Sequence, residues 1–359
     1  MRIAILGTRG IPANYGGFET FAEELATRLA IRGHQVSVYC RERNSPSYRG
    51  VRLIYLPTIH HKYFDTLAHT FVSTLHLLAH RVDAALYCNA ANALFTILPR
   101  MAGIPVALNV DGIERKRRKW NALARGWYSM SEYLSTVLPN RFVTDAKAIQ
   151  EYYRAEYGKD SLFIPYGADH HAVETRGTLE TLGLEAGSYF LYVSRMEPEN
   201  RALEVREAFE ATPTPMKLAL IGDAPHADEY IRRVRDTKDS RIVAPGAIYG
   251  LGYRELGSGC FAYIHATEVG GTHPALIEAM GRGNLVLYLD TAENREVCGD
   301  AGLAYSDEAG LRARILDAIG MSEPARETLR AKAAARARER YDWDAVTTQY
   351  ESLLTDLAT

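Results

Sequence analysis

Residues 261–289 predict a strand, a glycine-bearing loop, a short helix and a second strand in direct succession. The apolar runs at the two ends of this stretch are typical of buried strands in a parallel sheet. Gly270 and Gly271 lie in the loop, and Pro274 suits the first turn of the helix. A glycine loop that leads into a helix N-terminus presents free N–H groups and the positive end of the helix dipole. The stretch therefore predicts an anion-binding turn in an α/β fold.

Two carboxylates flank this turn, Glu268 in the loop and Glu278 on the helix. Neither position has an evident packing role for an acid. Both suit hydrogen bonds to hydroxyl groups, Glu268 to those of a sugar and Glu278 to those of a ribose. Gly270, Gly271 and Thr272 would then hold a phosphate between them. The alternative is an ordinary glycine turn, which a lone pair of glycines would favour.

The N-terminus predicts a second unit of the same kind. A strand at 2–6 ends in the loop GTRGIPANYGGFET, and a helix is expected at 19–32. The spacing differs from the GxGxxG of dinucleotide-binding folds, and a loop of about a dozen residues is long for an α/β unit without a function. Gly16 and Gly17 would place backbone N–H groups near donor phosphates or a transferred sugar. A flexible glycine loop is the alternative.

Strands and helices alternate through the chain, and the alternation restarts near residue 189. A chain of 359 residues exceeds the size that one core serves well. We therefore expect an α/β fold of two doubly wound, Rossmann-like domains, 1–165 completed by a C-terminal helix at 344–359, and 166–343. The other expected strands are 35–40, 51–56, 84–87, 106–110, 162–165, 189–193, 217–221 and 242–244, and the other expected helices are 63–81, 91–102, 201–211, 226–237, 324–341 and 346–357.

Two runs in different halves resemble the signature of retaining glycosyltransferases of family 4. GGFE at 16–19 resembles the family's GGxE loop. EVGGTHPALIEAM at 268–280 resembles its two glutamates around a glycine loop, with a longer spacing than the family usually has. The loop GTRGIPANYGGFET is most similar to the rhamnosyltransferase-like branch. The resemblance implies the GT-B fold, in which two Rossmann-like domains face each other across a cleft.

The same resemblance implies a reaction and its substrates. A sugar would move from a nucleotide-diphosphate donor to a glycan or lipid-linked glycan in surface polysaccharide synthesis, with retention of anomeric configuration. Rhamnose from dTDP-rhamnose is the expected donor sugar. Two alternatives stay open: a nucleotide-sugar epimerase of the same architecture, and a non-catalytic nucleotide-sugar-binding protein.

The run SRMEPENR at 194–201 resembles the family's G-R-x-x-x-E-K segment, whose cations neutralise the leaving diphosphate. Arg195 matches its Arg. Asn200 stands at the Lys position, so Arg201 at the start of a helix is expected to supply the second cation. No carboxylate is placed as a nucleophile. The resemblance implies front-face attack, with Glu268 as a candidate catalytic residue.

The polar loop DGIERKRRKW at 111–120 follows an expected strand. Because α/β folds bind ligands at the carboxyl ends of parallel strands, Asp111 is expected to contact a sugar hydroxyl or help deprotonate an acceptor. A turn aspartate is the alternative. Arg115, Lys116 and Arg118 lie in a basic run that suits a lipid-linked diphosphate acceptor or an anionic membrane surface. A solvated basic surface is the alternative.

Composition and the lack of targeting signals bear on the partners and the cellular location that we expect for the protein. The formal net charge of −2 gives no reason to expect nucleic acid as a partner. Four scattered cysteines fit free thiols in a reducing compartment. No signal peptide or membrane-spanning run is evident, so we expect a cytoplasmic protein, at the inner face of the membrane if it uses a lipid-linked acceptor. No metal or cofactor is expected. The sequence Asp342-Trp343-Asp344 matches DxD, the metal motif of a different glycosyltransferase fold, and this match is interpreted as coincidence.

Overall fold

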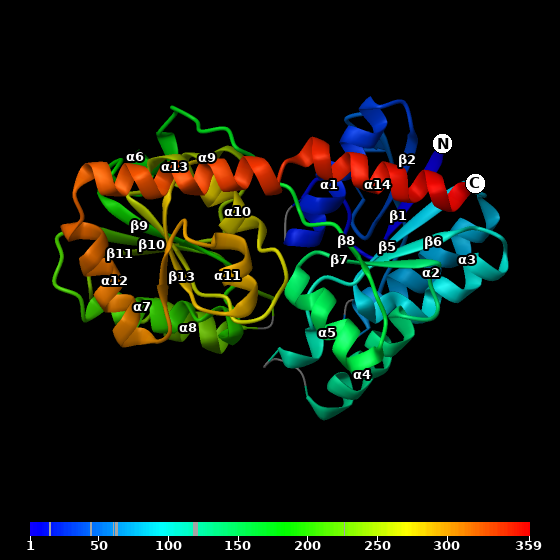
Figure 1. The fold of residues 1–359 in the computed structure, drawn as a ribbon, viewed down its shortest axis with the longest axis horizontal. Helices are drawn as coiled ribbons and strands as arrows, with labels where there is room; N and C mark the ends of the chain where they lie inside the picture. The colour runs from blue at the N-terminus through cyan, green and yellow to red at the C-terminus, as the bar shows by residue number, and fades with distance from the viewer. Residues whose placement is uncertain (14–15, 44, 60, 62–63, 118–120, 226) are drawn as a thin grey trace. The chain divides into compact units, whose positions relative to one another are not determined.

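The computed structural model describes residues 1–13, 16–43, 45–59, 61, 64–117, 121–225 and 227–359. These residues form two compact units (Figure 1). The first comprises Met1–Gly167, Gly270–Thr272 and Trp343–Thr359, and the second comprises Ala168–Val269 and His273–Asp342. Each unit has its own sheet and its own core.

The sheet of the first unit has the order β3-β4-β2-β1-β5-β6-β7-β8 among the described residues, and only β3 with β4 is antiparallel there. The chain starts at β1, runs outward through β2 and β4, and then continues on the other side of β1 with β5. The direction of winding therefore reverses between β1 and β5. The strands are β1 (Arg2–Leu6), β2 (Gln35–Cys40), β3 (Ser47–Tyr48), β4 (Val51–Tyr55), β5 (Ala84–Cys88), β6 (Val106–Asn109), β7 (Arg141–Thr144) and β8 (Leu162–Phe163).

Helices cover both faces of this sheet. In Figure 1, α1 and α14 lie along one side of the strands, and α4 and α5 lie on the other. The core on the side of α5 includes Tyr87, Leu108 and Tyr153, each buried. The helical segments are α1 (Gly17–Ile31), α2 (Asp65–Ala79), η1 (Ala90–Thr96), α3 (Ile97–Met101), η2 (Glu114–Lys116), α4 (Ala122–Ser135), α5 (Lys147–Tyr157) and α14 (Trp343–Ala358).

The sheet of the second unit has the order β11-β10-β9-β12-β13-β14, and its described pairs are parallel. Its winding reverses between β9 and β12. The strands are β9 (Tyr189–Val193), β10 (Lys217–Ile221), β11 (Ile242–Gly246), β12 (Ala262–His265), β13 (Leu285–Leu289) and β14 (Leu303–Tyr305). The helical segments are α6 (Gly177–Thr181), η3 (Pro198–Asn200), α7 (Ala202–Glu210), α8 (Asp228–Arg235), α9 (Gly250–Gly259), α10 (Pro274–Gly281), α11 (Ala292–Cys298), α12 (Glu308–Gly320) and α13 (Glu323–Arg340).

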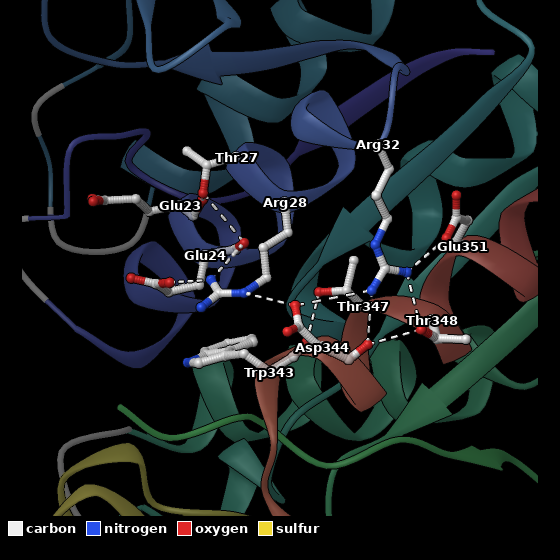
Figure 2. Close-up of polar contacts among 10 residues, drawn as sticks. All are labelled: Glu23, Glu24, Thr27, Arg28, Arg32, Trp343, Asp344, Thr347, Thr348 and Glu351. Atoms are coloured by element: carbon white, nitrogen blue, oxygen red, sulfur yellow. Dashed lines mark hydrogen bonds and ion pairs between the residues drawn. The ribbon is translucent and has the colours of Figure 1, made fainter. Parts of the chain in front are cut away.

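The C-terminal helix α14 is fastened to α1 by polar contacts, which Figure 2 shows. Arg32 donates to Glu351 at 2.7 Å and to Thr348 at 2.9 Å. The Nε atom of Arg28 lies 3.7 Å from a carboxylate oxygen of Asp344. These contacts hold the last residues of the chain against its first helix.

Several observed elements have no counterpart in the sequence prediction, among them α4, β7 and α5. Helix α4 is hard to recognise from apolar periodicity because its buried positions include the polar residues Ser131 and Glu132. The expected helix 91–102 is divided into η1 and α3. Its start has the Asn89 side chain accepting from the backbone N–H of Ala91 at 2.9 Å. In the described part of the chain, no helix is long and apolar enough to cross a membrane.

Candidate functional site

Two loops of the second unit meet where its winding reverses, one after β9 and one after β12. The backbone N–H of Glu268 donates to the carbonyl of Glu199 at 2.9 Å and ties the loops together. The Nε atom of Arg201 lies 3.2 Å from a carboxylate oxygen of Glu268. Arg201 is the N-cap of α7 with a left-handed backbone (φ 57°), so its cation lies beside a helix N-terminus. In doubly wound folds this reversal point is where ligands bind.

Arg195 and Asn200 lie in the loop after β9. The amide of Asn200 donates to the Arg195 carbonyl at 2.7 Å, and Tyr192 donates to the Asn200 carbonyl at 2.7 Å. Asn200 is buried and its amide shapes the loop. Arg195 is about a quarter exposed, with its guanidinium 3.7 Å from Glu197. The cations that face outward from this loop are therefore Arg195 and Arg201.

Glu278 lies on α10 and is buried. Its carboxylate is 3.4 Å from the guanidinium of Arg282, whose Cζ atom lies 5.0 Å from the ring centroid of Tyr253. Burial raises the pKa of Glu278, while Arg282 and Tyr253 act to lower it. The prediction that this carboxylate has no packing role is therefore wrong, because it is half of a buried ion pair. Sequence reasoning missed Arg282, although its i,i+4 spacing from Glu278 was a usable signal.

The loop after β1 in the first unit is held by carboxylates of α1. The backbone N–H of Arg9 donates to Glu19 at 2.9 Å, and that of Ala13 donates to Glu23 at 2.6 Å. Gly10 has a positive φ of 111°, and a Cβ there would lie 2.6 Å from the sulfur of Cys40. These contacts hold the loop in a defined conformation.

Gly16 and Gly17 lie at the start of α1. Gly16 is the N-cap in an extended conformation and supplies no side-chain cap. A Cβ built on it would have only the carboxylate of Glu19 nearby, at 3.4 Å. The N-terminus of a helix of 15 residues is therefore left without a side-chain acceptor from its cap residue.

Asp111 and Asp145 form a carboxyl pair in the first unit. They follow the neighbouring strands β6 and β7, and their side chains share a hydrogen bond. Asp111 has a positive φ of 56°, and its N–H donates to Asn109 at 3.0 Å. Asp145 is fully buried, and burial raises its pKa well above the ordinary value, with the Asp111 carboxylate raising it further. Sequence reasoning missed Asp145 because it did not predict β7.

Gly270, Gly271 and Thr272 group with the first unit. The backbone N–H of Thr272 donates to the carboxylate of Asp145 at 2.6 Å, and its hydroxyl donates to the Asp145 carbonyl. A Cβ on Gly271 would overlap that carboxylate, so only glycine allows this approach. Gly271 and Thr272 thus lie against a buried acid, which the sequence did not indicate.

The basic run is used largely inside the first unit. Arg115 lies 3.0 Å from the buried carboxylate of Glu132, which also accepts from Tyr152 at 2.9 Å. Arg117 is buried and pairs with Glu114 at 2.5 Å. The interpretation of the run as a solvated surface is therefore wrong for these two arginines. The Nζ atom of Lys116 lies 5.2 Å from the ring centroid of Tyr152, and Arg118 lies outside the described residues.

Trp343 and Asp344 of the DxD sequence are the first two residues of α14. Trp343 is buried near Phe21, with ring centroids 6.5 Å apart, while Asp344 is exposed and lies near Arg28. In the part of the chain that the structure describes, no three His, Cys, Asp or Glu side chains are grouped to hold a metal ion.

Comparisons with known proteins bear on the fold and on the family that the chain resembles. Residues 15–171 match the model of Glycosyltransferase Family 4. The match covers less than half of the chain and lies in its N-terminal part. No protein among the curated sequences matches the chain.

Solved structures are similar to the chain beyond the residues that the family model matches. HepE of Anabaena, in complex with UDP and glucose, has a TM-score of 0.81 at 16% identity, over 99% of this chain and 100% of that one. Sucrose-phosphate synthase of Thermosynechococcus elongatus has a TM-score of 0.80 at 17% identity, over 99% and 98%. WaaG, a glycosyltransferase involved in lipopolysaccharide biosynthesis, has a TM-score of 0.75 at 16% identity, over 99% and 100%. The predicted GT-B fold of two Rossmann-like units is confirmed.

Proposed function

We propose that the chain transfers a sugar from a nucleotide-diphosphate donor to a hydroxyl of a glycan or lipid-linked glycan, with retention of configuration and without a metal ion. The observation that carries this proposal is the junction of Arg201 and Glu268 at the reversal point of the second unit. A cation at a helix N-terminus suits the charge that develops on a leaving diphosphate. HepE, with UDP and glucose bound, supports a nucleotide-sugar as the donor.

The candidate site residues of the second unit have distinct roles in this reaction. Arg195 and Arg201 neutralise the diphosphate as the bond to the sugar breaks. Glu268, held by Arg201, hydrogen-bonds the transferred sugar. Glu278 accepts from the ribose hydroxyls, and Arg282 lies 3.4 Å from its carboxylate and opposes the rise in pKa that burial causes.

The first unit takes the acceptor side of the reaction. The N–H groups at Gly16 and Gly17 stabilise negative charge, as helix N-termini do. Asp111 accepts a hydrogen bond from the acceptor hydroxyl. Asp145 holds a proton beside it, so that a single negative charge resides on the pair. Rhamnose from dTDP-rhamnose is the proposed donor, on the likeness of the loop after β1 to the rhamnosyltransferase-like branch.

The test is nucleotide-diphosphate binding by calorimetry with Arg201→Gln and Arg195→Gln. A charge-assisted hydrogen bond contributes about 1.5–3 kcal/mol, so each variant should bind at least about tenfold more weakly. Arg295→Gln is the matched control, because Arg295 is an exposed arginine of the same unit paired with Asp290 at 2.8 Å. Unchanged affinity in both site variants would contradict the donor assignment.

Product analysis then separates the proposed transferase from its alternatives. Mass spectrometry with a panel of nucleotide-sugars and a lipid-linked acceptor should show sugar transfer in excess chelator. An epimerised donor formed without acceptor would indicate an epimerase. Donor binding without any product would indicate a binding protein.

A further inference from the structure

The loop that carries Glu268 in the second unit is held at its backbone by groups from three other elements. Tyr305 of β14 donates its hydroxyl to the carbonyl of His265 at 3.0 Å. The amide of Asn294 on α11 donates to the carbonyl of Thr267 at 3.0 Å. The N–H of Glu268 donates to the loop after β9 at 2.9 Å. The chain is therefore fixed at three points between the end of β12 and Glu268 itself.

Asn294 is fully buried near the start of α11. Its Nδ2 atom lies 3.0 Å from the carbonyl of Thr267 and 3.0 Å from that of Leu289, the last residue of β13. One amide group therefore joins the loop after β12 to the end of the neighbouring strand. An apolar side chain of the same size would remove the donor from both buried carbonyls, and a buried carbonyl without a donor is costly.

His265 joins this network from the end of β12. Its imidazole is buried, and burial lowers its pKa to about 3, with the contact to the Asn294 side chain acting to raise it. The ring is therefore neutral at ordinary pH and keeps one N–H, for which the Oδ1 atom of Asn294 is an acceptor. The ring centroid of His265 also lies 4.7 Å from that of His273, the N-cap of α10. The two histidines thus link the start of the loop to its end.

These contacts fix one peptide plane in particular, the plane that joins Thr267 to Glu268. Its carbonyl accepts from Asn294, and its N–H donates to the carbonyl of Glu199 at 2.9 Å. Because a peptide unit is planar, the two hydrogen bonds set the position of the Glu268 α-carbon. The carboxylate of Glu268 lies 3.2 Å from Arg201 in this arrangement. A displacement of about 1 Å from the productive geometry costs roughly a hundredfold in rate.

We propose that Asn294 is a positioning residue for sugar transfer, which holds the peptide before Glu268 so that this carboxylate meets the transferred sugar. Asn294 is buried and acts through the loop, with His265 and Tyr305 as further supports. This role rests on the proposed function, in which Glu268 contacts the sugar. It adds a residue of α11 to a site that is otherwise formed by the loops after β9 and β12 and by α10.

The test is a double-mutant cycle of Asn294→Ala and Glu268→Gln, assayed for sugar transfer with the panel of nucleotide-sugars and the lipid-linked acceptor. Asn294→Ala alone should lower kcat by at least about tenfold and leave the KM for the donor within about twofold, because the diphosphate contacts are unchanged. In the Glu268→Gln background the same exchange should have little further effect, since residues that act as a unit are not additive.

Asn284→Ala is the matched control, because Asn284 is a buried amide of the same unit that donates to the carbonyl of Gly257 at 2.9 Å. It should lower the melting temperature about as much as Asn294→Ala does, with kcat close to that of wild type. Tyr305→Phe is a milder second variant, which carries the test if Asn294→Ala does not fold. It removes the hydroxyl that donates to His265, so it should lower kcat severalfold, and this loss should also vanish in the Glu268→Gln background.

Hydrogen exchange measured by mass spectrometry reports on the loop without turnover. Peptides that cover residues 265–269 should exchange faster in Asn294→Ala than in wild type or Asn284→Ala. Equal exchange in the three proteins, or losses of kcat that add in the double variant, overturns the role of Asn294 alone. Absence of transfer by wild type would contradict the proposed function itself, and the role of Asn294 with it.

Discussion

Single carboxyl groups in this protein acquire their properties from the side chains that lie beside them in the folded chain. Glu268 lies beside Arg201 and keeps partial exposure, while Glu278 is buried beside Arg282. Asp145 is fully buried beside Asp111, in a position that disfavours a second negative charge. The same side-chain chemistry thus yields a partly exposed ion pair, a buried ion pair and a buried acid with a raised pKa.

Asp145→Asn should leave the fold intact and change how stability depends on pH. The pKa of Asp145 is raised in the folded chain, so the folded state binds the proton more tightly than the unfolded state. Its stabilising effect is complete below the ordinary value of 3.8 and is lost as pH rises toward the folded pKa. An asparagine cannot ionise, and its amide can still accept from the N–H of Thr272.

Urea unfolding from pH 4 to pH 8 checks this. Wild type should lose up to about 1.4 kcal/mol per pH unit relative to Asp145→Asn in the window above pH 4. Asp300→Asn is the control, because Asp300 is exposed and pairs with Lys332 at the surface. Parallel pH profiles for wild type and Asp145→Asn would show that Asp145 is ionised in the folded chain.

At the scale of elements, two helices of the first unit show opposite arrangements. α14 buries its apolar residues in the expected way, with Trp343, Tyr350 and Leu354 turned inward. α4 buries two serines and a glutamate beside Tyr128, and it exposes Leu123, Met130 and Tyr133. Both helices bury an aromatic side chain, but only α14 buries most of its large apolar residues.

Trp343→Ala and Asp344→Asn should differ sharply, although the residues are adjacent. Trp343 is buried near Phe21, and removing a buried aromatic side chain costs about 3–5 kcal/mol. Asp344 is exposed, and an exposed ion pair contributes about 0–1 kcal/mol.

Chemical denaturation of both variants measures the difference in their free energies of unfolding.

Activity with and without Mg²⁺ or Mn²⁺ should be the same for Asp344→Asn as for wild type. If wild type requires a metal ion for activity and Asp344→Asn no longer responds to that ion, the DxD sequence is a metal site and our interpretation is wrong.

At the scale of the whole molecule, the chain leaves the first unit after Gly167, returns to it briefly at Gly270–Thr272, and re-enters it at Trp343 for its last helix. The core of the second unit is built from its own strands and helices, including Phe190, Phe209 and Leu287. The first unit depends on α14, where Tyr350 is fully buried and accepts a hydrogen bond from Asn109 at 2.8 Å.

Removal of residues 343–359 should therefore destabilise the first unit selectively. Hydrogen exchange measured by mass spectrometry should show loss of protection in β1, β5 and α1, with β9 and β12 protected as in wild type. Tyr350→Phe is the control, because it keeps the ring and removes one hydrogen bond worth about 1 kcal/mol. Equal loss of protection in both units would show that they unfold as one.

The sequence by itself determined the alternation of strands and helices, the glycine loops at strand ends and hence the doubly wound class. These features depend on periodicity and turn chemistry over a few neighbouring residues. The same local signals placed Glu268 in the loop after β12 and Arg201 at the start of the helix that follows β9.

Only the tertiary structure decided which of these groups meet. The contact of Asp145 with Asp111, and that of Tyr350 with Asn109, depend on strand order and on the return of the C-terminal helix. A sequence pattern also could not show that Leu123 on α4 is exposed. The burial of Glu132 on the same helix depends on Arg115 and Tyr152, which belong to other elements. Burial and pairing are properties of the folded neighbourhood, and local patterns carry no record of partners that folding brings together.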